Sequence, residues 1–301
     1  EEFYISRDTV ERAYNTLKKR NIIVSIRGKG FYINQNQLIG KRNILFLINK
    51  LSAYKLRIYN SFVETIGPNA HVELLIYYCD EDLFLSYLEK NILHYDFFVV
   101  MPHFKGLNSE YKRMSTFVKK ALNSIPNEKL FFLDNAIDCD DFDNLKVFQD
   151  FNSDLYEALK RNINKISKYQ KFVLIFPKHC VYPYPIEILN GFRKFCKEHN
   201  IAFDVTDHYF KNMILNKGEL FLTIEESDLV ELLKQIRDKK YNLGDDIGVI
   251  SYNDTPLKEL LGITVVSTDF KYMGAKMAEI ILGNKQKSVK VPFRFIDRKS
   301  M

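Results

Sequence analysis

Long apolar runs and paired cysteines are both missing from this sequence. The longest apolar stretches, such as residues 97–101, have the length of a strand and fall far short of the roughly 20 residues that span a bilayer. The four cysteines, Cys79, Cys139, Cys180 and Cys196, are widely separated and form no CxxC pair. This spacing argues against a disulfide framework or a zinc site and favours reduced thiols in a cytosolic protein.

Motifs of the common enzyme classes are missing as well. The sequence has no P-loop, no G-x-G-x-x-G after its first predicted strand, no H-E-x-x-H and no G-x-S-x-G. No secretory leader is visible. We therefore expect a cytoplasmic protein without catalytic activity, cofactor or metal.

What is present favours a small module joined to a large one. The 301 residues exceed one ordinary core, and 46% hydrophobic with 27% charged residues is typical of a folded, soluble chain. The formal charge of +6 suits an anionic partner. Residues 1–34 carry seven Lys and Arg against four Asp and Glu, so basic residues outnumber acidic ones at this end.

Residues 6–33 predict a helix followed by a hairpin. Ser6 is a good N-cap, and an apolar face then recurs at helical spacing from Val10 to Leu17. The β-branched run 22–24, a basic glycine turn at 27–30 and a second strand at 31–33 follow.

Such an arrangement suits DNA. A helix can enter a major groove about 12 Å wide, where its first-turn amides and Arg7 hold phosphates and base edges. A hairpin with Arg27 and Lys29 at its tip can lie on the adjacent backbone or in the minor groove. Gly28 permits a tight turn and close approach.

The motif S-R-D-T-V-E-R-A-Y at residues 6–14, with Leu17, the strand 22–24 and R-G-K-G-F-Y-I at 27–33, resembles the recognition helix and wing of the GntR family. This resemblance implies a partial winged helix-turn-helix, preceded in the family by further helical residues, so we expect the chain to be a piece of a longer module. The predicted DNA-binding residues are Ser6, Arg7, Thr9, Arg12, Arg27, Gly28 and Lys29. The alternative is a surface helix and basic hairpin with no role in DNA binding.

Residues 41–301 alternate apolar strands with amphipathic helices, which indicates an α/β fold of doubly wound parallel sheets. Strands are predicted at 44–48, 72–77, 97–101, 130–133, 172–176, 202–205, 220–223 and 247–251, and helices at 54–66, 82–91, 110–122, 153–166, 185–199, 227–239 and 272–282. Two such halves predict a cleft at the carboxyl ends of the strands.

The C-terminal third carries a second resemblance. L-T-I-E-E-S-D at 222–228, G-D-D-I-G-V-I-S-Y-N-D-T at 244–255 and V-V-S-T-D-F at 265–270 resemble the sensor domain of LacI-type repressors, whose fold is that of type I periplasmic binding proteins. The resemblance implies a DNA-binding part and linker at 1–40 and a sensor at 41–301. Within the sensor we expect one lobe at about 41–148 plus 268–284 and a second at about 149–267 plus 285–301.

The resemblance also implies an effector pocket. Its predicted residues, including polar residues at strand ends and at the start of one helix, are His103, Asp134, Phe148, Glu187, Glu225, Asn253 and Phe270. For each of them the alternative is an ordinary strand-end polar or packing role. Ile188 stands where the family usually has arginine. A pocket with carboxylates but without that arginine disfavours an anionic effector, so we expect a neutral monosaccharide such as fucose or arabinose.

These features together predict a transcription regulator, most simply a repressor. A homodimer would read an inverted-repeat operator, and sugar binding would alter the spacing of its two DNA-binding arms. Two alternatives stay open: a solute-binding receptor without a DNA role, and a GntR-type fusion to a pyridoxal-phosphate enzyme domain. The second would need a Schiff-base lysine in a recognisable setting, and we find none.

Overall fold

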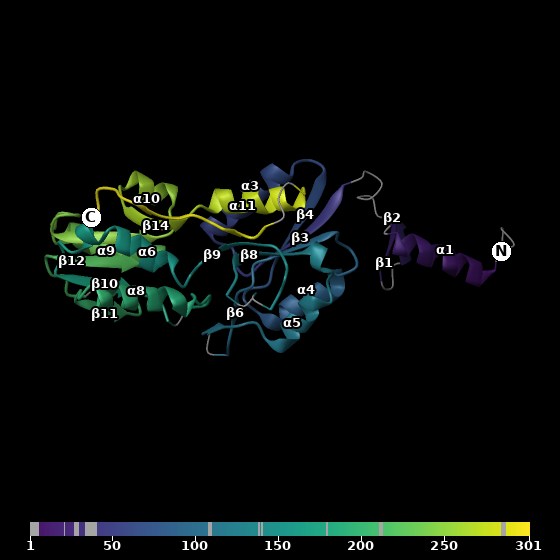
Figure 1. Ribbon diagram of the computed structural model, residues 1–301, viewed down its shortest axis with the longest axis horizontal. Coiled ribbons are helices and arrows are strands. Elements are labelled where there is room, and N and C mark those ends of the chain that lie inside the picture. Colours follow the sequence, from purple (N-terminus) through teal and green to yellow (C-terminus); the bar gives the residue numbers. More distant parts are fainter. Residues whose placement is uncertain are drawn as a thin grey trace.

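The computed structural model describes residues 6–20, 22–26, 30–33, 41–107, 110–137, 139, 141–178, 180–210, 213–283 and 287–301. Figure 1 shows a helix and hairpin at one end, followed by two α/β lobes in a row.

The N-terminal segment consists of helix α1 (Arg7–Lys19) and the antiparallel strands β1 (Ile23–Ile26) and β2 (Gly30–Ile33). Ser6 caps the helix as predicted, because its side chain accepts a hydrogen bond of 3.2 Å from the amide of Thr9. The predicted order of helix, strand and strand is therefore confirmed. One helix and one hairpin do not amount to a complete winged-helix domain.

Lobe 1 is built on a six-stranded sheet whose hydrogen-bonded pairs are all parallel, in the order β15-β9-β8-β5-β3-β4. The strands are β3 (Arg42–Ile48), β4 (Ala70–Ile76), β5 (Phe97–Val100), β8 (Leu130–Asn135), β9 (Lys146–Gln149) and β15 (Val289–Lys290). The helices are α3 (Ala53–Ile66), α4 (Glu81–Asn91), α5 (Thr116–Asn123) and α11 (Phe270–Ile281), with a short 3-10 turn at Asn127–Lys129.

Helices cover both faces of this sheet. Ile58 and Phe62 of α3 pack with Met273 and Met277 of α11 in one apolar cluster. The residues of α4 and α5 form a second cluster on the other face. The contact between α3 and α11 requires Gly274, because a Cβ atom there would lie 2.1 Å from the carbonyl oxygen of Ile58. This close backbone contact holds α3 and α11 together on one face of the lobe 1 sheet.

The helix predicted at 110–122 is wrong in its first half. Strand β7 (Tyr111–Lys112) pairs instead with β6 (Phe104–Lys105) in a small antiparallel hairpin. Helix α5 begins at Thr116, where Ser115 caps it by accepting from the amide of Val118 at 3.2 Å. The N-cap serine, rather than the polar residues before it, marks where the helix starts.

Lobe 2 has a sheet in the order β11-β10-β12-β13-β14-β16, parallel except for β16. Its strands are β10 (Lys171–Ile175), β11 (Phe203–Thr206), β12 (Glu219–Thr223), β13 (Ile247–Tyr252), β14 (Thr264–Thr268) and β16 (Phe293–Ile296). Its helices are α6 (Asp154–Arg161), α7 (Ile163–Ile166), α8 (Ile186–Glu198), α9 (Glu226–Asp238) and α10 (Pro256–Leu260).

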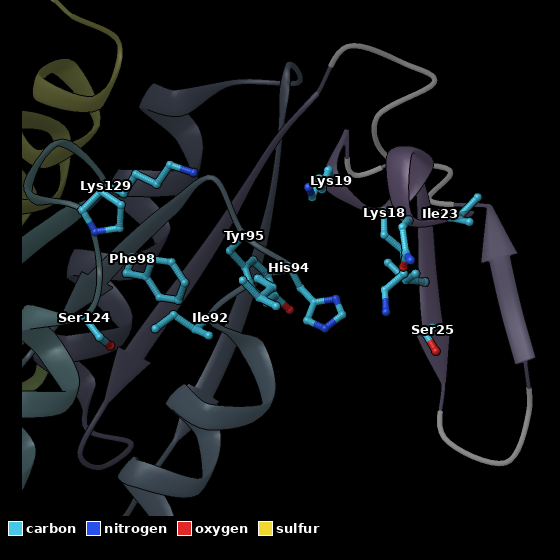
Figure 2. A pocket seen from close by; sticks show the side chains of 14 residues that line it. Lys18, Lys19, Ile23, Ser25, Ile92, His94, Tyr95, Phe98, Ser124 and Lys129 are labelled. Carbon is cyan, nitrogen blue, oxygen red and sulfur yellow. The ribbon is translucent and has the colours of Figure 1, made fainter. Parts of the chain in front are cut away.

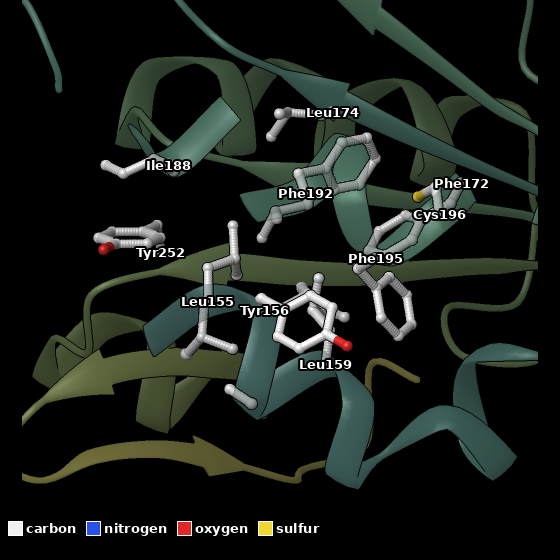
Figure 3. Close-up of a cluster of buried hydrophobic side chains, with 14 of the residues drawn as sticks. Leu155, Tyr156, Leu159, Phe172, Leu174, Ile188, Phe192, Phe195, Cys196 and Tyr252 are labelled. Carbon is white, nitrogen blue, oxygen red and sulfur yellow. The ribbon is translucent and has the colours of Figure 1, made fainter. Parts of the chain in front are cut away.

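A large apolar core fills the space beside this sheet (Figure 3). Leu155 and Leu159 of α6 pack with Phe192 and Phe195 of α8 and with Phe172 of β10. Helix α9 contributes to a separate cluster on the other side. The helix predicted at 153–166 is interrupted at Asn162, which lies between α6 and α7.

The chain crosses between the lobes at three places: from β9 to α6, from β14 to α11 and from β15 to β16. We expected the last crossing near residue 285. However, β15 still pairs with β9 of lobe 1, so the chain leaves lobe 1 only after Lys290. Within the described residues, no helix combines the length and apolarity that crossing a membrane requires.

Candidate functional site

Two adjoining cavities mark the interface between the lobes at the carboxyl ends of the strands, where ligands bind in open α/β sheets. The inner cavity has a volume of about 20 Å³ and the outer one about 260 Å³. Both cavities are lined by Tyr54, Tyr184, Tyr252 and Asn253. We call the two together the interlobe cleft.

Lobe 1 contributes a buried carboxylate, Asp134, at the end of β8. Its Oδ2 atom lies 3.5 Å from Lys55 Nζ and 3.0 Å from His103 Nε2, and it accepts from the Tyr54 hydroxyl at 3.3 Å. Its Oδ1 atom accepts from Gln149 Nε2. The side chains of Lys55 and Asp134 are wholly buried. This carboxylate is therefore surrounded by donors from its own lobe.

The contacts extend beyond Asp134. Lys55 Nζ also donates to Asn49 Oδ1, and Asn49 Nδ2 lies 3.1 Å from Cys79 Sγ. On the other side, the Thr268 hydroxyl donates to Gln149 Oε1 at 2.8 Å. We call this set the Asp134 network; its members are Asn49, Tyr54, Lys55, His103, Asp134, Gln149 and Thr268. Gln149 is the last residue of β9 and Thr268 the last of β14, and the chain crosses between the lobes after each of these strands. The hydrogen bond between the two side chains therefore links two of the three crossings.

Burial and charge pairing determine the ionisation of the network. Burial lowers the pKa of Lys55 to about 8, although Asp134 partly offsets this. Burial alone would raise the pKa of Asp134, but Lys55 and the hydrogen bonds from His103 and Gln149 outweigh it and bring that pKa to about 2. Burial, together with Lys55, lowers the pKa of His103 to about 4. At neutral pH the network thus holds one balanced ion pair and an uncharged histidine.

Lobe 2 contributes a different kind of surface, centred on Asn253. This residue adopts a left-handed backbone conformation with φ of 64°. Lys258 Nζ supports it by donating to the carbonyl oxygens of Tyr252 and Asn253, both at 2.9 Å. Asn253 Oδ1 is buried and has no hydrogen-bond partner among the described residues. An unpaired acceptor of this kind is costly unless a ligand or water donates to it.

Lys50 follows β3 and faces the tyrosines of lobe 2. Its Nζ atom lies 4.7 Å from the ring centre of Tyr184 and 5.4 Å from that of Tyr182. No carboxylate among the described residues comes within ion-pair distance of it. Burial lowers the pKa of Lys50. Lys50 is therefore a partly buried cation in contact with aromatic rings, and the carboxylates of Glu225 and Asp134 act on it only from beyond ion-pair distance.

Three of the predicted pocket residues line the cleft, and a fourth, Asp134, is buried behind it and lines neither cavity. His103 and Asp134 bond one another, Asn253 lines both cavities, and Glu225 lines the outer one. Whether they contact an effector stays a prediction.

The other three predicted pocket residues line neither of the two cavities, and their part in effector binding stays a prediction. Phe270 is buried behind the cleft, with its ring centre 4.6 Å from that of Tyr54. Phe148 lines a separate cavity of about 500 Å³ near the crossings. Glu187 bonds Arg113 of lobe 1 at 3.3 Å.

Sequence reasoning missed Lys55, Gln149, Tyr54 and Tyr184. One signal was present for Lys55. The buried residues of α3 are Lys55, Ile58, Phe62 and Ile66, so a lysine occupies an apolar position of a helical stripe. A charge in such a stripe requires a buried partner.

A neutral effector was expected because the pocket was predicted to hold unpaired carboxylates. In the structure, however, Asp134 is paired with Lys55. The premise is wrong for the inner part of the cleft. In the outer cavity, Glu225 and Glu226 do supply carboxylates.

A further cavity, of about 820 Å³, lies elsewhere (Figure 2). Lys18, Lys19 and Ile23 line one side, and His94 and Tyr95 line the other. These lobe 1 residues precede β5, so the cavity lies at the amino ends of the strands, opposite the cleft. No cluster of potential metal ligands occurs within the described residues.

The fold is shared with known regulators. The family model of the periplasmic binding protein-like domain matches residues 167–301. A transcription regulator from Lactobacillus plantarum has a TM-score of 0.60 at 18% identity, covering 87% of this chain and 99% of that one. A LacI family transcriptional regulator from Lactobacillus casei with bound glucose has a TM-score of 0.64 at 12% identity, covering 86% and 99%.

The trehalose repressor from Escherichia coli has a TM-score of 0.64 at 14% identity, covering 85% of this chain and 99% of that one. No curated protein matches this sequence. At these identities the similarities establish the two-lobed, periplasmic-binding-protein-like fold predicted for the larger part of the chain.

Proposed function

We propose that this protein is a sugar-responsive transcription regulator without enzymatic activity. The observation that carries the proposal is the interlobe cleft, whose donors and acceptors stand at the carboxyl ends of two sheets in the fold shared with sugar-bound regulators. Its outer cavity of about 260 Å³ lies just below the range of about 300–1,000 Å³ typical of ligand pockets. That size suits one monosaccharide.

The N-terminal segment supports a role in DNA binding of the GntR winged-helix kind. Arg7 and Arg12 are exposed on α1, and no residue of this helix is buried. Ser6 and Thr9 also lie at its exposed start, with their hydroxyl oxygens 2.8 Å apart. Arg27, Gly28 and Lys29, at the predicted wing tip, lie outside the described residues. The seven residues together form the proposed DNA contact.

The proposed mechanism is a population shift. Sugar in the cleft favours one closure of the lobes, and closure changes the relative position of the two N-terminal segments in a homodimer. The dimer reads an inverted-repeat operator whose half-site spacing matches one of these arrangements.

The test begins with selection of duplexes from a randomised DNA library by the full chain. Operator affinity is then measured with and without a panel of sugars that includes fucose and arabinose. We expect one sugar to change the affinity. Bound sugar that leaves operator affinity unchanged, or a chain that selects no sequence, would favour a solute receptor instead.

A pair of variants checks the DNA contact. Arg7→Gln should weaken operator binding and reduce the slope of log affinity against log salt by about one. Arg161→Gln, which alters an exposed arginine of lobe 2, should leave both unchanged. Equal effects of the two variants would argue against a DNA role for α1.

A further inference from the structure

The inner cavity has an unusual charge. Among the described residues that line it, Lys50 alone carries a charge at neutral pH, because the pKa of His103 is lowered to about 4. The ion pair behind it is balanced within lobe 1, and Glu225 and Asp134 act on Lys50 only from beyond ion-pair distance. This end of the cleft therefore has one positive charge without a direct carboxylate partner.

The outer cavity has the opposite character. Glu225 and Glu226 line it, together with Asp254, which is already paired with Arg298 at 2.9 Å, and Lys258 supplies the single ammonium of the lining. Lys258 is already committed to two backbone carbonyl oxygens. Carboxylates accept hydrogen bonds from sugar hydroxyls but repel an anion. A ligand with one acidic group must therefore direct that group away from Glu225 and toward Lys50.

The volumes of the two cavities favour the same orientation of the ligand. The inner cavity of about 20 Å³ is close to the space that one water needs, roughly 10–15 Å³, so only a small terminal group enters it. The outer cavity is large enough for a ring. Tyr54, Tyr184 and Tyr252 line both cavities and offer apolar ring faces where the two meet.

We propose that the cleft takes a sugar acid, a hydroxylated monocarboxylate of uronate or aldonate type. Its carboxylate lies against Lys50, and a ring or chain hydroxyl donates to Asn253 Oδ1, the buried acceptor without a partner. This inference rests on the proposed function and names its effector class. One ammonium matches one carboxylate, whereas a phosphate dianion would need further donors that the inner cavity lacks.

The experiment measures binding by isothermal titration of the full chain. The probes are D-glucuronate, D-galacturonate and D-gluconate, the neutral sugars D-glucose, D-galactose, L-fucose and L-arabinose, and D-glucose 6-phosphate. We expect one of the acids to bind at least about tenfold more tightly than the neutral hexose of the same configuration, since a charge-assisted hydrogen bond is worth that much. Rising salt should weaken only the acid.

Variants assign the effect to one atom. Lys50→Met should abolish the preference, so that the acid binds no more tightly than the matching neutral hexose, and Lys50→Arg should retain the preference. Lys239→Met, at an exposed position after α9, should behave as wild type. Circular dichroism checks that each variant is folded.

The remaining outcomes overturn one claim or the other. A neutral sugar bound as tightly as any acid, or a preference that survives Lys50→Met, would overturn the sugar-acid inference and leave the proposed function standing. If D-glucose 6-phosphate bound more tightly than any of the acids, the sugar-acid inference would also be overturned, because the preferred ligand would carry a phosphate in place of a carboxylate. An acid that binds through Lys50 without changing operator affinity would sustain the inference and overturn the regulatory role. Failure of all probes to bind would overturn both.

Discussion

The two walls of the interlobe cleft are built in opposite ways. On the lobe 1 side, Lys55 and Asp134 are charged, wholly buried and bonded to one another and to their neighbours. On the lobe 2 side, Asn253 presents an acceptor with no partner among the described residues, beside the ring of Tyr184. A satisfied network is rigid, whereas an unsatisfied group gains from a ligand. The Asp134 network of lobe 1 thus provides a fixed platform, whereas Lys50 beside it and Asn253 of lobe 2 are the groups that a ligand completes.

The substitution with the largest expected effect removes the negative charge of Asp134 from the lobe 1 platform. Asp134→Asn leaves the Lys55 ammonium buried without its counter-charge, which should lower the free energy of unfolding of lobe 1 by about 3–5 kcal/mol. Urea unfolding followed by tyrosine fluorescence measures it. The matched control is Glu231→Gln, which breaks an exposed pair with Lys234 and should cost less than about 0.5 kcal/mol. Similar losses of stability from Asp134→Asn and Glu231→Gln would show that the Asp134 network does not stabilise lobe 1 more than an exposed ion pair does.

Lowering the pH should reduce the stability of lobe 1, which forms the same wall of the cleft. The pKa of His103 falls from 6.5 to about 4 on folding, chiefly through burial. Between these values the unfolded chain binds the proton and the folded chain does not, so stability falls as pH drops from about 6.5 to 4. The loss assigned to His103 is about 2–3 kcal/mol. Below pH 3.8, protonation of Asp134, whose folded pKa is about 2, adds a further loss.

The measurement compares wild type with His103→Gln across this pH range. The variant should lose less stability between pH 6.5 and 4 than wild type does. His71→Gln, at an exposed histidine of β4, should keep the wild-type profile. Parallel curves for wild type and His103→Gln would contradict an uncharged, buried His103.

The lobe 2 wall should respond in affinity rather than stability. Asn253→Gly removes the acceptor while glycine accepts the φ of 64°, so stability should change by less than about 1 kcal/mol. Affinity for the sugar that binds in the titration panel should fall about tenfold. Asn200→Gly, also at a positive φ of 53° but at the exposed end of α8, serves as control. A stability loss without an affinity loss would make Asn253 a structural residue.

The smallest expected effect concerns the contact of Lys50 in lobe 1 with the ring of Tyr182 in lobe 2. Tyr182→Leu removes the more distant of the two rings near Lys50 and should cost about 0.5–1 kcal/mol in stability. Tyr182→Phe keeps the ring and should cost less. Equal losses would assign the effect to the hydroxyl instead of the ring.

Much of the fold could be predicted because its elements carry local signals. The apolar strand at Ile44–Ile48 and the capped helix after Ser6 follow from hydrophobic periodicity and N-cap chemistry. The hairpin β6–β7 could not be predicted, since two-residue strands carry no pattern of their own. The crossing after Lys290 depends on β15 pairing with β9, a contact between distant parts of the chain.

The site was less predictable than the fold. Strand ends identified Asp134, His103 and Asn253, because parallel strands place their carboxyl ends together. The partners of Asp134 could not be found in this way. Lys55 and Gln149 lie within a helix and a strand, and only the packing of α3 against the sheet brings Lys55 to the carboxylate. Phe270, predicted from a motif, lines neither cavity, since a motif fixes a position in the chain and not the direction of a side chain.

The contact between α3 and α11 has a consequence for biosynthesis. Ile58 and Phe62 of α3 are covered by Met273 and Met277, more than two hundred residues later in the chain. As the ribosome releases the first half of the protein, these apolar side chains remain uncovered until α11 has emerged. Lobe 1 is thus begun first and finished late, and in that interval its exposed surface is the natural target for chaperones and for premature aggregation.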